Sequence, residues 1–106
     1  MTLEELKAQI KPGWTVRIID HQTLSEGRDK VKVEEVREDG LLLRPSRPWS
    51  SQGRTFPTYL FTWDGDLEVE GFKVHRFWTP TAITSRSTPG VRQVVKTFVF
   101  SAPKGY

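Results

Sequence analysis

The sequence predicts a small, mainly β protein with one short helix at its N-terminus. Its 106 residues have the length of a single domain, spanning 1–106. A helix-capping pattern precedes Gly13, and apolar and polar residues alternate in several short runs after it. These observations favour a cap helix over 2–11 and a barrel of about six short antiparallel strands over 14–101.

The cap helix is predicted from its two ends. Thr2 and Glu5 have the spacing of a capping box, in which each side chain binds the other residue's backbone N–H. Pro12-Gly13 ends the helix. Three apolar residues fall on one helical face: Leu3, Leu6 and Ile10. We expect this face to cover one end of the sheet.

Period-two alternation and β-branched residues indicate the strands. They lie at 14–19, 31–36, 41–43, 59–63, 67–69, 72–74 and 91–100. Residues 38–40 form a turn in which Gly40 supplies a positive φ. The last strand is apolar on both faces, as in strands that lie between two layers or at an interface.

Strands of this number and length fit an SH3-like or an OB-like barrel. The polar excursion at 20–29, after the first strand, favours the SH3-like layout. Two further segments, 44–58 and 79–90, are predicted as long loops because they are rich in Pro, Ser and Thr. A barrel of this kind assigns no function by itself.

Charge is distributed in blocks along the chain, although the net charge is only +3. Residues 44–62 carry three arginines and no acid, 63–70 carry four acids and no base, and 71–106 carry six bases and no acid. Two interpretations stay open. Either the blocks create a field that attracts an anionic partner, or folding pairs the acidic strand with basic neighbours.

The first long loop is the strongest functional candidate, because arginines flank aromatic residues there. Arginine binds phosphate or carboxylate in a fork, and aromatic rings stack on bases of single-stranded nucleic acid. The predicted contact residues are Arg44, Arg47, Trp49, Arg54, Phe56, Tyr59 and Arg86. The same residue types anchor protein interfaces, and Trp49 and Phe56 also suit lids on the barrel core.

Two other clusters have residue types that suit a site. The carboxylates of 64–70 suit a hard cation or, alternatively, a solvated strand face paired with Lys73 or Arg76. His75 and Arg76 suit the acid–base and anion-stabilising roles of a small toxin-like ribonuclease. Adjacent strand residues point to opposite faces, however, so we rank this enzyme second and expect a structural role for His75.

Several classes are excluded by composition. The chain has no cysteine, no apolar run long enough for a membrane span, no secretory signal pattern and no phosphate-binding glycine motif. We therefore expect a cytoplasmic, non-enzymatic binding module or small regulator with no catalytic residues, cofactor, metal or membrane partner. Its expected partner is nucleic acid or a protein of the nucleic-acid machinery, and the oligomeric state stays open.

Overall fold

A computed structural model describes residues 1–21, 25–26, 30–83 and 87–103. These residues form a helix, α1 (Leu3–Gln9), and ten strands. The strands are β1 (Thr15–Asp20), β2 (Ser25–Glu26), β3 (Val31–Val36), β4 (Gly40–Pro45), β5 (Trp49–Ser51), β6 (Arg54–Phe56), β7 (Tyr59–Thr62), β8 (Leu67–Glu70), β9 (Lys73–Trp78) and β10 (Gln93–Ser101).

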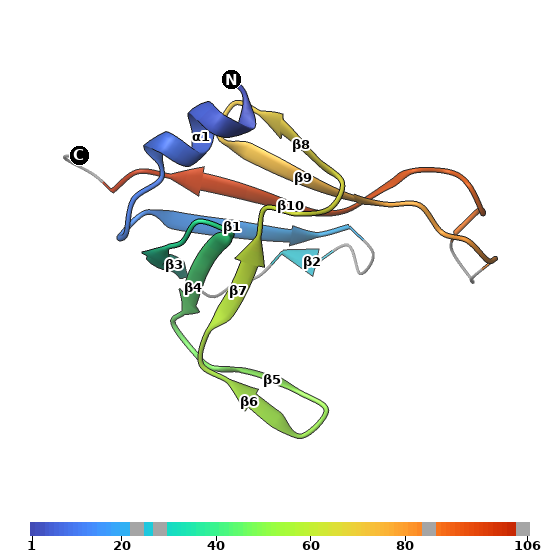
Figure 1. Cartoon of the computed structure of the whole chain (residues 1–106). Coiled ribbons are helices and arrows are strands. Elements are labelled where there is room, and N and C mark those ends of the chain that lie inside the picture. The colour runs from blue at the N-terminus through green and yellow to red at the C-terminus, as the bar shows by residue number, and fades with distance from the viewer. Residues whose placement is uncertain (22–24, 27–29, 84–86, 104–106) are drawn as a thin grey trace.

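Eight strands form one curled antiparallel sheet, a half-barrel (Figure 1). Its order is β7-β4-β3-β1-β10-β9-β8, and β2 pairs with β1 outside this path. The first and last long strands are neighbours, with Thr15 opposite Ser101 and Asp20 opposite Lys96. The mainly β prediction is confirmed, whereas the sheet curls only into a half-barrel.

The helix begins as the sequence predicts. The Glu5 backbone N–H donates to Thr2 Oγ1 at 3.2 Å, and Thr2 N donates to Glu5 Oε1 at 3.4 Å. Leu6 and Ile10 are buried in the same apolar cluster as the strands, so α1 covers one end of the half-barrel (Figure 1). A helix of seven residues is too short to be stable alone, and this packing holds it.

The core lies on the concave face of the half-barrel. Phe61 of β7 is fully buried at its centre, with its ring centroid 4.6 Å from that of Phe98 and 4.9 Å from that of Trp63. Alternate residues of the long strands face this core: Val16, Val31, Val33, Leu41, Leu43, Val74, Phe98 and Phe100. The period-two pattern thus identifies the buried face correctly.

Gly40 is needed for a reason other than the predicted one. It is not among the glycines with a positive φ. It pairs with Thr62 across β4 and β7, and a Cβ at this position would lie 1.9 Å from the Phe61 carbonyl oxygen. The strands approach so closely there that only glycine fits.

The segment 44–58 is not the loop that the sequence predicts. Trp49, Ser50 and Ser51 pair with Phe56, Thr55 and Arg54, so β5 and β6 form a separate two-stranded hairpin. We call 46–58, with this hairpin, the arm. It projects away from the half-barrel (Figure 1). The second predicted loop, 79–90, forms no helix or strand in its described residues.

Candidate functional site

The structure separates the seven predicted contact residues. Arg47, Trp49, Arg54 and Phe56 belong to the arm, and Tyr59 begins β7 directly beyond it. Arg44 lies on β4 and Arg86 lies outside the described residues. The arm therefore holds the predicted contact residues that lie together in the structure.

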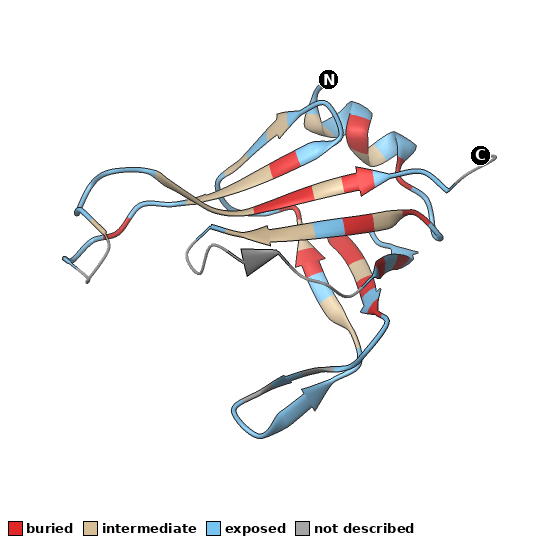
Figure 2. Cartoon of the chain, turned by 180° about the vertical axis from the view of Figure 1, so that it is seen from behind, coloured by how far each residue is buried: buried red, intermediate tan, exposed pale blue. Residues whose placement is uncertain are grey.

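The arm is exposed at 46–48, 50 and 52–57, and Thr58 at its end is half-buried (Figure 2). Arg54 and Thr55 are exposed, and the Phe56 side chain keeps 43% of its surface in contact with solvent. The lid interpretation is therefore wrong for Phe56. Trp49 stands opposite Phe56 in the backbone register.

A two-residue turn closes the arm. Gln52 and Gly53 have φ values of 52° and 76°. Two consecutive positive values are typical of the turn that best matches the twist of an antiparallel ribbon. The turn places Arg54 next to the tip, opposite Ser51.

The arginines of 44–62 are not equivalent. Arg44 Nε donates to Glu34 Oε1 at 2.8 Å, so this arginine is held by a neighbouring strand. Arg47 and Arg54 are exposed and form no ion pair within the described part of the chain. Among the described arginines of 44–62, Arg47 and Arg54 therefore keep their charge available to a partner.

Arg76 bridges the open side of the half-barrel. Its Nη2 donates to the Thr62 carbonyl at 2.7 Å and its Nη1 to the Asp64 carbonyl at 3.3 Å. The guanidinium carbon lies 5.2 Å from the centroid of the Phe61 ring. These contacts join β9 to the end of β7, two strands that do not pair.

An open pocket of about 430 Å³ lies beside this bridge. Its described lining residues are Tyr59, Arg76, Phe77, Trp78, Val95 and Lys96. The Lys96 ammonium lies 5.8 Å from the centroid of the Tyr59 ring, and Trp78 is 41% exposed. We call this the seam pocket.

The seam pocket is basic because of strand register. Lys96 stands directly opposite Arg76 in the β9–β10 pairing, so two cations are neighbours on the concave face. Like charges in this position repel each other. Asp20 faces Lys96 from β1, yet no described residue that lines the pocket carries a carboxylate. An anion in the pocket would relieve the repulsion.

The seam pocket was only partly predicted from the sequence. Tyr59 is in the predicted contact set, whereas Arg76, Trp78 and Lys96 are not. The acid-free segment 71–106 indicated a basic surface. It could not indicate which residues face each other, because the β-bulge between Val94 and Lys96 sets that register.

The acidic strand is paired with a base, and the base is Arg92. Nη2 and Nε of Arg92 donate to the two carboxylate oxygens of Asp66 at 2.6 and 2.7 Å. Nη1 donates to Glu68 at 2.8 Å, and the guanidinium lies 3.5 Å from the centroid of the Phe77 ring. These hydrogen bonds lower the pKa of Asp66 and raise that of Arg92.

This pairing bears on one of the two interpretations of the charge blocks. Folding mixes the acidic block with a base from the C-terminal third, as one interpretation predicted, although the partner is neither Lys73 nor Arg76. Among the described residues no cluster of three or more metal-type ligands occurs.

The two histidines meet on one threonine. Thr97 is 4% exposed, and its Oγ1 lies 2.7 Å from His21 Nε2 and 2.9 Å from His75 Nδ1. His75 Nε2 lies 3.1 Å from Glu70 Oε2. His75 is thus on the convex face of β9, whereas Arg76 reaches the core side.

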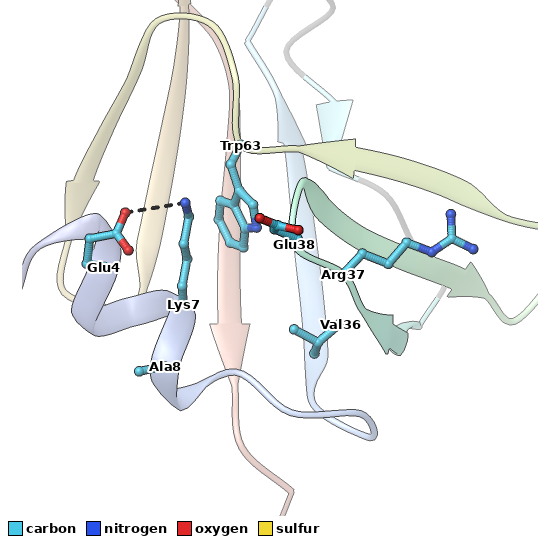
Figure 3. A pocket seen from close by; sticks show the side chains of 7 residues that line it. All are labelled: Glu4, Lys7, Ala8, Val36, Arg37, Glu38 and Trp63. Atoms are coloured by element: carbon cyan, nitrogen blue, oxygen red, sulfur yellow. Dashed lines mark hydrogen bonds and ion pairs between the residues drawn. The ribbon is translucent and has the colours of Figure 1, made fainter.

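A second pocket lies between α1 and the β3–β4 turn (Figure 3). Its described lining residues are Glu4, Lys7, Ala8, Val36, Arg37, Glu38 and Trp63. Lys7 contacts both Glu4, at 3.4 Å, and the face of Trp63. Charges of both signs line this pocket, and they favour no single ligand charge.

Comparisons with protein-family models, curated proteins and solved structures found no match to this chain. No described helix has the length and apolar character needed to cross a bilayer.

Proposed function

We propose that this protein is a non-enzymatic binding module whose partner is a nucleic acid. One observation carries the proposal: Arg76 and Lys96 stand side by side in a pocket that also offers Tyr59 and the exposed Trp78. Cations bind phosphates, and aromatic faces stack on bases, a contact that contributes about 1–3 kcal/mol per base.

The position of the arm supports the same partner. The arm ends where β7 begins, and Tyr59 contacts Lys96 at this junction. Arg47 and Arg54 of the arm and the cations of the seam pocket thus belong to adjoining surfaces. The predicted contact loop and the basic C-terminal third meet at Tyr59, which favours a polyanion over a small ion.

The test is a titration of labelled oligonucleotides, single-stranded and duplex, at several salt concentrations. We expect binding that weakens steeply with salt, with a log–log slope of about one unit per phosphate contacted. Lys96→Gln should lower the affinity and reduce this slope by about one unit.

Lys73→Gln is the matched control. Lys73 is an exposed lysine on β9, one residue from the buried Val74, and belongs to the opposite face from Arg76. This variant loses the same charge and should bind as the wild type does. Absence of binding to any oligonucleotide at low salt would reject nucleic acid, and capture of a protein partner would then favour a small regulator or inhibitor.

The ribonuclease alternative has weaker support. His75 contacts Thr97 and Glu70 on the convex face, while Arg76 contacts Phe61 and the seam. The two side chains do not converge on one phosphate. We expect no cleavage of single-stranded RNA above a mock preparation; cleavage that disappears in a folded His75→Gln variant would favour the enzyme.

We also retain two finer proposals from the sequence. An SH3-like or OB-like classification is supported by the short, curled antiparallel sheet with its cap helix. A cytoplasmic location is supported by the absence of cysteine from the sequence. An experimental structure and localisation of a tagged chain test them.

A further inference from the structure

At its root the arm is tied to the half-barrel by the Ser46 backbone N–H, which donates to the Lys30 carbonyl at 2.8 Å. Its strands form their own two-stranded sheet, and residues 46–48, 50 and 52–57 are exposed. A two-stranded hairpin alone is only marginally stable in water. Retaining such a hairpin on the surface is understandable when a partner binds it.

The chemistry of the arm indicates a polyanion. Residues 44–62 contain no acid, and Arg47 and Arg54 lack a partner among the described residues. Arg54 and Phe56 share one face of the ribbon, and Ser50 and Thr55 occupy the other. Both faces thus carry groups that bind phosphates or base edges.

The dimensions of the arm fit one particular polyanion. Each strand has three residues, so the paired ribbon is about 10 Å long at ~3.3 Å per residue. The major groove of B-form DNA is about 8.5 Å deep and admits a two-stranded β-ribbon. The deep, narrow major groove of duplex RNA does not admit side chains.

We propose that the arm enters the major groove of duplex DNA and places Arg54 against the base edges. This inference rests on the proposed function and specifies which nucleic acid is bound. Arg54 lies next to the turn and therefore reaches deepest. Arg47 and Lys96, at and beside the root of the arm, then face the phosphates that border the groove.

The experiment compares three probes of one mixed sequence: a 20-base-pair DNA duplex, its single strand and the corresponding RNA duplex. We expect the DNA duplex to bind most tightly. Arg54→Gln should weaken duplex binding about 5- to 150-fold, the range expected for losing an arginine–guanine contact. Bound protein should displace methyl green, a major-groove dye, and leave a minor-groove dye in place.

Arg37→Gln is the matched control, because Arg37 also flanks a hairpin turn and is exposed, at the end of the β3–β4 hairpin. It should change duplex affinity less than twofold. Circular dichroism melts verify that both variants fold.

The outcomes distinguish the two proposals. Equal or tighter binding to the single strand, or an Arg54→Gln variant that binds the duplex normally, would overturn the groove inference and leave the proposed function standing. Failure to bind any of the three probes would reject both.

Discussion

Two hairpins follow each other in this chain, and they differ in almost every physical respect except their backbone pairing. The β3–β4 hairpin buries Val31, Val33, Leu41 and Leu43 in the core. In the β5–β6 hairpin, Arg54, Thr55 and Phe56 are all exposed. Figure 2 shows this contrast.

The contrast shows that different forces maintain the two hairpins. Burial of apolar side chains stabilises β3–β4, and the rest of the sheet depends on it. The arm is held by its own hydrogen bonds and its turn, so substitutions in it should leave the half-barrel intact. Because the fold does not depend on the surface of the arm, this surface can carry a binding function.

The largest expected effect on stability comes from creating a cavity beneath the β3–β4 hairpin. Leu43 is fully buried, and Leu43→Ala should lower the free energy of unfolding by about 2–5 kcal/mol. Phe56→Ala, in the exposed arm, should change it far less. Urea melts of both variants measure the difference, and similar losses would show that the arm packs on the body in solution.

The second effect compares the glycines of the two hairpins. Gly40→Ala places a methyl group against the Phe61 carbonyl and should cost about 1–3 kcal/mol or more. Gly53 has open space around it but a φ of 76°, so Gly53→Ala should cost only about 1 kcal/mol, confined to the arm. Amide exchange would locate each loss; exchange that rises throughout the sheet in Gly53→Ala would contradict this view.

Lowering the pH should reduce the stability of the half-barrel and leave that of the arm unchanged. The pKa of Asp66 is lowered by hydrogen bonds from Arg92, so the ionised carboxyl stabilises the folded chain at pH above its unfolded value of about 3.9. This contribution disappears as the pH falls through the lowered folded value. The stability gap between wild type and Asp66→Asn should therefore be present at pH 7 and shrink as the pH is lowered below about 3.9 in urea melts.

The smallest effect is expected at the tip of the arm. Arg54 is exposed and unpaired among the described residues, so Arg54→Gln should change stability by less than about 0.5 kcal/mol. Calorimetry of the free protein gives this value. A larger loss would mean that Arg54 has a structural partner and is a poor probe of binding.

Local sequence patterns predicted much of the half-barrel and its cap helix. Thr2 and Glu5 fix the helix start, and alternation identifies the strands that bury Val33, Leu43 and Phe98. The arm was mistaken for a loop because prolines at 45, 48 and 57 and a run of serines hide its short strands. The Gln52-Gly53 dipeptide was its one available signal.

The seam pocket depends on information that local patterns lack. Arg76 and Lys96 are neighbours only because β9 pairs with β10 in a register that a bulge shifts. Arg92 lies 26 residues from Asp66, and His21 lies 76 residues from Thr97. Contacts over such separations follow from the closure of the sheet rather than from spacing along the chain.

The Thr97 cluster has a definite polarity when both imidazoles are neutral. The Glu70 carboxylate only accepts, so His75 Nε2 must carry a hydrogen, and Nδ1 must accept from the Thr97 hydroxyl. Thr97 has no second hydrogen, so His21 Nε2 must donate to it. The donors thus run in one direction, from His21 through Thr97 and His75 to Glu70. A proton added at His75 Nδ1 makes that nitrogen a donor, so the Thr97 hydroxyl hydrogen must turn away from His75 while its oxygen accepts from the ring. A proton on β9 thus changes the hydrogen bonding of the threonine that His21, at the end of β1, also contacts.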